Sequence, residues 1–277
     1  MSGEAPRALL VEGVLNPNNR PMPDIILQTK GIRKEFAGLV AVNNVDCTIC
    51  ENETIGVIGP NGAGKSTFFN LLTGYFIPEA GEIHYCGKDI TGVPPYERVG
   101  LGIVRTFQLV SVFDTLTVLE NAMLARVRFD KDYGKRNRFF LKGLLKSREK
   151  DYCLKALAAI GITDKAGVLV SELSYGKKRE LEIAIVLMMN PRVLLLDEPL
   201  AGLSMVEITE IVNIVRELRG TLTILLVEHK ISKILDLVER LYVMHEGQVI
   251  ACGEPNAVIC DPAVKQCYFG KEDAVCY

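Results

Sequence analysis

The segment GPNGAGKST at residues 59–67 has the residue types and the spacing of a phosphate-binding loop. It follows an apolar run, TIGVI, and precedes FFNLLTGY, which has the character of a helix. Glycines let the backbone curl so that several N–H groups point at one phosphate, and the start of a helix adds positive potential. Lys65 would reach the β- and γ-phosphates, and the Ser66 hydroxyl would ligate Mg²⁺. The segment therefore predicts a nucleotide site formed by Gly59, Pro60, Asn61, Gly62, Ala63, Gly64, Lys65, Ser66 and Thr67.

Two adjacent carboxylates follow another apolar run in LLLDEP (194–199). Asp197 would stand at the carboxyl end of a buried strand, where a parallel sheet delivers ligands, and it is our candidate for the Mg²⁺ shell. A structural role does not explain why Glu198, which repels Asp197, stands beside it. Next to a triphosphate, Glu198 would orient or deprotonate the attacking water. His229 ends the run LTILLVEH and is a candidate for γ-phosphate contact, although a lone histidine is more often structural.

Length and composition restrict the possible functions. The chain has 277 residues, of which 48% are apolar, enough for one large α/β domain or two small ones. Its formal net charge of −2 argues against nucleic acid as the main ligand. No apolar run approaches the roughly 18–20 residues that span a bilayer, and MSGEAPRALLVEG does not read as a secretory signal. A cytoplasmic protein is expected.

The order of apolar runs predicts the arrangement of the chain. Residues 54–59, 192–197 and 222–229 are nearly continuous apolar strands, as in a parallel sheet covered on both faces. Residues 241–252 read as a hairpin that turns at Glu246 and Gly247. Strand signals are missing from about residue 114 to 173, where amphipathic helix patterns replace them. The prediction is a doubly wound sheet with a helical insertion.

Cys47 and Cys50 form a C-x-x-C pair inside a segment that reads as a strand. Positions three apart on a strand point to opposite faces, and zinc sites usually need four ligands. We therefore interpret both residues as structural cysteines.

The chain resembles the ATP-binding cassette (ABC) ATPases over roughly residues 25–270, because six motifs of that family occur in the family order. The resemblance implies ATP and Mg²⁺ as cofactors. It makes Asp197 the magnesium aspartate, Glu198 the catalytic glutamate and His229 the switch histidine. Gln108 in VRTFQ matches the glutamine that reaches the metal site and couples it to the transporter. Phe36 matches the aromatic residue that stacks on adenine, with Val42 beneath the base.

The segment LSYGK (173–177) occupies the place of the family signature, which usually reads Leu-Ser-Gly-Gly-Gln. Ser174 and Gly176 are retained, and a hydroxyl with a backbone N–H at a helix start can bind a γ-phosphate. The segment departs from the usual pattern at Tyr175 and at Lys177. Lys177 either adds positive charge to the phosphate site or points to solvent.

The resemblance also implies a fold and its boundaries. The fold is α/β, a P-loop NTPase (RecA-like) core with a mostly parallel sheet, an N-terminal antiparallel β portion and an inserted helical subdomain. Residues 1–23 form a flexible tail, and the ATPase domain covers 24–270. Its core is 24–108 and 176–255 and its helical subdomain 109–175, and a C-terminal extension covers 256–277.

Several departures from the common pattern resemble one subgroup, the ATPase subunits of branched-chain amino acid importers and of their urea and amide relatives. They are RELEIA, DEPLAGLS, IVRTFQ, TVLENAM and YFG. The resemblance implies a second ABC ATPase subunit as partner, whose signature completes the site. It also implies separate transmembrane permease subunits, an extracytoplasmic solute-binding protein acting indirectly, and a peripheral position on the inner face of the cell membrane.

Two other readings stay open. One is an ABC ATPase of a different system, in lipid export, translation or DNA maintenance, and the other is a P-loop small-molecule kinase. The basic stretch at residues 126–150 is either a solvated helix face or a patch for anionic lipid headgroups.

Overall fold

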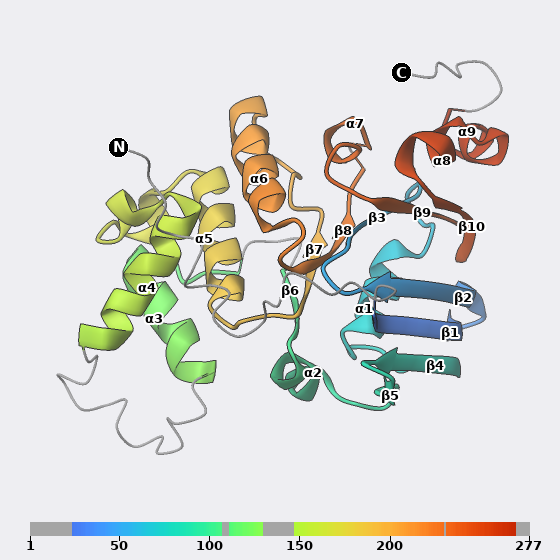
Figure 1. The fold of residues 1–277 in the computed structure, drawn as a ribbon, viewed down its shortest axis with the longest axis horizontal. Helices are drawn as coiled ribbons and strands as arrows, with labels where there is room; N and C mark the ends of the chain where they lie inside the picture. The colour runs from blue at the N-terminus through green and yellow to red at the C-terminus, as the bar shows by residue number, and fades with distance from the viewer. Residues whose placement is uncertain (1–23, 107–110, 130–146, 230, 270–277) are drawn as a thin grey trace. The chain divides into compact units, whose positions relative to one another are not determined.

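A computed structural model describes residues 24–106, 111–129, 147–229 and 231–269 (Figure 1). These residues form two compact units. The sheet unit comprises the described residues of Arg20–Arg105, Arg192–Ala201 and Val215–Tyr277. The helical unit comprises those of Thr106–Pro191 and Gly202–Ile214.

A six-stranded sheet forms the centre of the sheet unit, in the order β10-β9-β3-β8-β7-β6. Neighbouring strands are parallel except β9 and β10, which pair as an antiparallel hairpin. Every residue of β3, β7 and β8 is buried, which confirms the three apolar strands predicted from the sequence. Because these strands are parallel, their carboxyl ends lie at one edge of the sheet. The strands are β3 (Thr54–Ile58), β6 (Ile103–Arg105), β7 (Val193–Asp197), β8 (Thr223–Val227), β9 (Arg240–His245) and β10 (Gln248–Gly253).

The predicted antiparallel portion is a four-stranded sheet in the order β2-β1-β4-β5. The long strands β1 and β2 are joined by Ala37 and Gly38, which both have positive φ, 47° and 88°. Two such residues make the tight turn that matches the twist of a hairpin. The turn brings Phe36 opposite Leu39. The strands are β1 (Ile25–Phe36), β2 (Leu39–Cys50), β4 (Ala80–Tyr85) and β5 (Lys88–Asp89).

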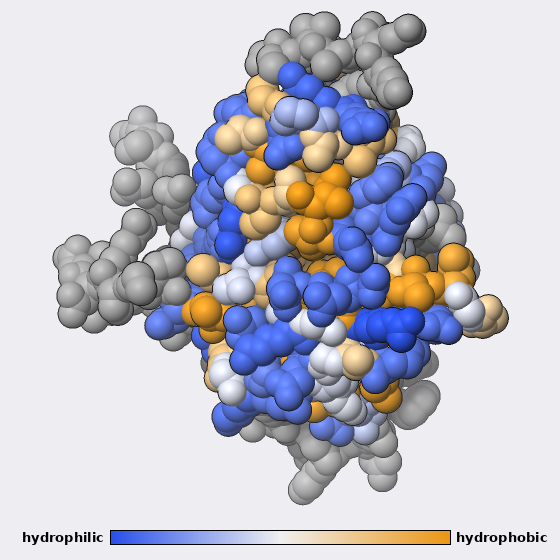
Figure 2. Space-filling model, turned by 90° about the vertical axis from the view of Figure 1, so that its right-hand side faces the viewer, coloured by the Kyte–Doolittle hydropathy of each residue, from blue (hydrophilic) through white to orange (hydrophobic). Residues whose placement is uncertain are grey.

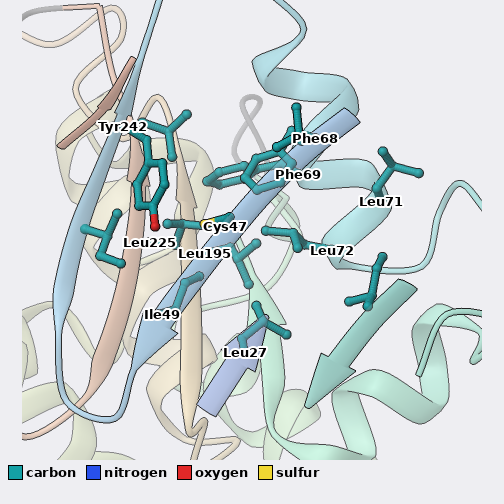
Figure 3. Packing of buried hydrophobic residues seen from close by; sticks show 14 of the residues in the cluster. Leu27, Cys47, Ile49, Phe68, Phe69, Leu71, Leu72, Leu195, Leu225 and Tyr242 are labelled. Carbon is teal, nitrogen blue, oxygen red and sulfur yellow. The ribbon is translucent and has the colours of Figure 1, made fainter. Parts of the chain in front are cut away.

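The core of the sheet unit takes side chains from both sheets and from helix α1 (Lys65–Leu72) (Figure 3). Helix α1 contributes Phe68, Phe69, Leu71 and Leu72. Cys47 lies in β2 within this core, and burial raises the pKa of its thiol to about 12. Cys47 is therefore a protonated core residue at neutral pH, in line with its interpretation as structural. The unit also contains α2 (Pro95–Leu101), α7 (Ile231–Ile234), α8 (Pro255–Cys260) and α9 (Pro262–Phe269).

The helical unit contains α3 and α4, which lie within the stretch of about 114–173 where the sequence predicted helices, and α5, which follows that stretch. Helices α3, α4 and α5 share one core, in which Val118, Leu157 and Leu181 are fully buried. Most of the basic stretch 126–150 lies outside the described residues, but Arg126 contacts Glu149 at 3.1 Å. The helices are α3 (Val118–Phe129), α4 (Ser147–Ile160) and α5 (Tyr175–Leu187), and residues 205–214 of α6 (Met205–Leu218) also belong to this unit.

On the face seen in Figure 2, hydrophobic side chains lie in separate groups among hydrophilic ones. The exposed large hydrophobic residues of the sheet unit include Ile25, Phe36, Leu39, Tyr75 and Ile77. Within the described ranges, none of the helices combines the length and the apolar composition needed to cross a membrane.

Arg98, a residue of α2 that sequence reasoning did not single out, is fully buried and fixes the far end of α1. Its guanidinium donates to the carbonyls of Leu71 at 2.7 Å and Leu72 at 2.8 Å, which end the helix. It also donates to the carbonyls of Ile90, Thr91 and Val93. Burial lowers the pKa of Arg98 to about 10, so the group stays charged at neutral pH.

We expect Arg98→Met to lower the free energy of unfolding by at least about 3 kcal/mol, because the carbonyls of Leu72, Thr91 and Val93 lose the Arg98 donor and each carbonyl left without one costs roughly 1–3 kcal/mol. The carbonyls of Leu71 and Ile90 keep a backbone donor. Arg98→Lys keeps the charge and up to three donors, so its loss should be smaller. Urea unfolding of the two variants beside the wild type measures both effects. Equal stability of Arg98→Met and the wild type would contradict this role.

Candidate functional site

The predicted phosphate loop connects β3 to α1, as its sequence context required. Lys65, the first residue of α1, is 5% exposed, and its Nζ donates to the carbonyls of Gly59 at 2.7 Å and Pro60 at 3.0 Å. Two carbonyls of the phosphate loop itself therefore hold the ammonium group of Lys65 in place. Gly64 has φ 97°, and a Cβ there would lie 2.2 Å from the Ala41 carbonyl oxygen, so only glycine fits.

Two carboxylates lie close enough to influence Lys65. Burial lowers the pKa of Lys65, and the negative charges of Glu198 and Asp197 act against that shift. The structure thus brings together the lysine and the two acidic residues that the sequence placed 132 and 133 positions further along the chain (65 to 197 and to 198).

Asp197 is the last residue of β7 and is buried. Its Oδ2 accepts a hydrogen bond of 2.5 Å from Arg105, the last residue of β6. Arg105 also donates to Oδ1 of Asn70 in α1 at 2.6 Å. Arg105 therefore links two strand ends to the helix of the phosphate loop. Sequence reasoning missed it, although its place at the end of a strand in VRTFQ was a usable signal.

Glu198 has a left-handed backbone conformation, with φ 47°. Such a conformation costs a residue with a Cβ on the order of 1–3 kcal/mol and is concentrated at functional sites. The Glu198 amide donates to the Val227 carbonyl at 2.9 Å, which ties the turn to the end of β8. Oε1 of Glu198 lies 2.9 Å from Nε2 of His229. The sequence placed His229 within the strand, whereas β8 ends at Val227 and His229 stands in the following loop.

Glu228 is a further residue that sequence reasoning missed. It is 2% exposed, and its Oε1 accepts from the amide of Leu200 at 2.7 Å. Its Oε2 lies 3.2 Å from the amide of His229. Glu228 therefore connects the loop after Glu198 to the loop that carries His229, and it helps to set the distance between those two side chains.

The two residues expected near the base differ in exposure. Phe36 is exposed at the end of β1 and packs edge-on against Phe76, with ring centroids 5.1 Å apart. Its strand partner Leu39 stands two residues before Ala41, which contacts the phosphate loop at Gly64. Val42 is fully buried in the core, so it presents no surface to a ligand in this structure.

The LSYGK segment lies at the start of α5 in the helical unit. Ser174 is the N-cap, and its Oγ accepts from the amide of Lys177 at 3.3 Å. The Ser174 hydroxyl and the Gly176 amide both donate to Oε1 of Glu207, each at 3.0 Å. Sequence reasoning did not identify Glu207.

The side chain of Lys177 pairs with two carboxylates of the helical unit. Its Nζ lies 2.8 Å from Oε1 of Glu180 and 3.3 Å from Oε2 of Glu210. Although burial opposes the charge, these two carboxylates raise the pKa of Lys177. Gln108 lies outside the described residues.

Comparison with known protein families gives one that is described as ABC transporter, and its model matches residues 42–201. The matched range contains the phosphate loop, LSYGK and the acidic pair. The chain belongs to the ABC transporter family. It is an ATPase of the ATP-binding cassette type, as the resemblance in the sequence predicted.

Two relatives extend the match over most of this ABC ATPase. LivG of Salmonella typhimurium, a high-affinity branched-chain amino acid transport ATP-binding protein, is 37% identical over 90% of this chain and 100% of its own. BraF of Pseudomonas aeruginosa, which carries the same description, is 36% identical over 89% of this chain and 98% of its own.

Solved structures confirm the predicted fold class. The ADP conformation of MJ1267, an ATP-binding cassette of an ABC transporter, matches with a TM-score of 0.78 and 34% identity. The match covers 89% of this chain and 99% of that one. The α/β core with its mostly parallel sheet, antiparallel sheet and helices is that of the ABC cassettes.

Proposed function

We propose that this ABC ATPase is the nucleotide-binding subunit of an importer and hydrolyses ATP at the edge of the sheet where β3, β7 and β8 end. The observation that supports this most strongly is the gathering of Lys65, Asp197, Glu198 and His229 at that edge. A cation for phosphate, a carboxylate for metal and a carboxylate for water are the groups that ATP hydrolysis needs.

Lys65 and the backbone N–H groups of residues 61–67 hold the phosphates. The oxygen ligands of Ser66 and Asp197 are the hard donors that Mg²⁺ prefers, so the residues present fit that ion, and Gln108 would complete the set. Bound Mg²⁺ would neutralise charge on the β- and γ-phosphates. Arg105 donates to Oδ2 of Asp197, which fixes that carboxylate at the carboxyl end of β7.

Glu198 orients or deprotonates the attacking water, and His229 contacts both Glu198 and the γ-phosphate. The hydrogen-bonding distance between their side chains supports this pairing. The strained backbone at Glu198 supports a functional role for the same residue.

Phe36 stacks on the adenine, whereas Val42, which is fully buried, supports β2 from the core and does not touch the base. Its exposure at the end of β1, and the link from its partner Leu39 to Gly64 through Ala41, support this assignment. The edge-on contact with Phe76 holds the Phe36 ring in place from one side.

Ser174 and Gly176 act on the ATP of a second ABC ATPase subunit, so that two subunits share two sites. This pair would work on the cytoplasmic side of the membrane with separate permease subunits and, through them, with an extracytoplasmic solute-binding protein. Nucleic acid is not an expected partner. The high-affinity branched-chain amino acid transport of LivG and BraF supports a branched-chain amino acid as the solute, with urea or an amide as a related choice.

The test is to purify the ATPase with its permease partners in lipid nanodiscs and to measure phosphate release. A branched-chain amino acid carried by the cognate binding protein should stimulate hydrolysis, whereas urea and acetamide should not. Stimulation by a lipid substrate would instead indicate an exporter. Transfer of phosphate to a small-molecule acceptor would indicate a kinase and overturn the proposal.

A further inference from the structure

We propose that Glu207 is a built-in anion that occupies the phosphate-binding donors of the signature and must release them when a second subunit's ATP arrives. The inference rests on the proposed function, in which Ser174 and Gly176 bind the γ-phosphate of a partner. It adds a competitor from the same chain to that step.

The contacts of Glu207 are those expected of a phosphate oxygen. A single oxygen, Oε1, accepts from the Ser174 hydroxyl and from the Gly176 amide, both at 3.0 Å. Because the Ser174 oxygen also accepts from the amide of Lys177, its own proton is directed to Glu207. The two donors assigned to the γ-phosphate are therefore both engaged by one carboxylate oxygen.

The second oxygen of Glu207 anchors it to its own helix. Oε2 accepts from the amide of Ser204 at 3.0 Å and from its hydroxyl at 2.8 Å. Ser204 and Glu207 thus form a capping box at the start of α6. The bonds from Ser204, followed by those from Ser174 and Gly176, outweigh burial and lower the pKa of Glu207 to about 2. Its carboxylate therefore stays ionised throughout the physiological pH range.

A helix cap alone does not explain this geometry, because the capping bonds use only Oε2. The other oxygen lies so close to the signature that a Cβ at Gly176 would come within 2.5 Å of it. Ser174 is exposed whereas Gly176 is buried. A phosphate can approach Ser174 from solvent, but it gains the Gly176 amide only when Glu207 moves aside.

Two anions that need the same donors compete. Glu207 should therefore raise the ATP concentration at which two subunits associate. In a Glu198→Gln background, where hydrolysis is slow, we expect Glu207→Gln to lower the MgATP concentration for half-maximal dimerisation by at least about threefold. Glutamine keeps the shape of the side chain and can serve in a capping box, but it carries no charge. Sedimentation velocity across an ATP titration measures the dimer fraction.

Two controls separate the competition from simpler effects. Glu217→Gln, at an exposed position further along α6, changes the net charge equally without touching the signature and should not shift the titration. Ser204→Ala removes the N-cap hydroxyl of α6 but leaves Glu207 within reach of Ser174 and Gly176, so any gain should be smaller than that of Glu207→Gln.

The outcomes distinguish a failure of the shared ATP site from a failure of the competition by Glu207. If Glu198→Gln alone forms no dimer with MgATP, the shared site itself is wrong. If Glu198→Gln dimerises but Glu207→Gln leaves the midpoint unchanged or raises it, the shared site stands and the competition is wrong. If Glu217→Gln shifts the midpoint equally, the shift is an effect of net charge, and the competition by Glu207 is likewise wrong.

Discussion

Replacing Glu198 with glutamine is expected to lower the rate of ATP hydrolysis at least about 100-fold, because loss of a general base or of the residue that positions water commonly costs about 10²–10⁴. ATP binding should persist, since Lys65 and the loop amides are untouched. Removing a negative charge near the γ-phosphate should also favour a dimer that holds ATP. The variant would then bind nucleotide tightly and release phosphate slowly.

Phosphate release and nucleotide binding, measured on the same preparation, test both halves of this expectation. Glu239→Gln is a matched control, because Glu239 pairs with Arg219 and lies at the amino ends of β3 and β9, opposite to the carboxyl ends that form the site, and should leave the rate unchanged. His229→Ala should also reduce the rate while keeping ATP bound. A wild-type rate in Glu198→Gln would remove Glu198 from the mechanism.

The elements of the fold could be predicted because their signals are local. The buried strands β3, β7 and β8 are unbroken apolar runs, and the β9–β10 hairpin turns at Glu246 and Gly247, which both have positive φ. The phosphate loop depends on a few glycines between a strand and a helix. These features need no knowledge of distant parts of the chain.

The supporting polar contacts could not be predicted, because each joins segments that are far apart in sequence. Arg98 caps a helix that ends 26 residues earlier, and Arg105 reaches Asp197 across 92 residues. Glu228 bonds to Leu200, 28 residues away, and Glu207 bonds to Ser174, 33 residues away. The strand-end place of Arg105 and the S-x-x-E spacing of Ser204 and Glu207 are visible locally, but neither identifies the distant partner. Those partners follow only from the strand order and from the contacts between α5 and α6.

Lys65→Ala and Ser174→Arg should each abolish hydrolysis, but for different reasons. Lys65→Ala removes the only charged side chain of the loop at residues 59–67, so nucleotide binding or its hydrolysis should be lost in the same subunit. Ser174→Arg should leave ATP binding by the same subunit nearly unchanged. It loses an N-cap, which costs about 1 kcal/mol, and places a large side chain where the partner's γ-phosphate must fit.

The contact between Ser174 and Glu207 indicates how an arginine at position 174 would act. The arginine would lie beside Glu207, whose carboxylate accepts from the serine in the wild type. A cation at this position would pair with that carboxylate, so it would block the signature by its bulk and would not attract phosphate by its charge. Ser174→Ala, which adds no bulk, is the matched control and should reduce the rate less.

Mixing the two inactive variants tests whether the signature acts on the partner subunit. In a symmetric dimer, a mixed pair contains one site with both defects and one site with neither, so about half of the wild-type rate per mixed dimer should return if the sites act independently. If the sites are strictly coupled, the rate stays low, but the intact site should still bind one ATP per mixed dimer. Equilibrium dialysis with labelled ATP counts that nucleotide. If Ser174→Arg instead abolishes ATP binding to the isolated subunit, LSYGK acts on its own chain's nucleotide and the shared site is wrong.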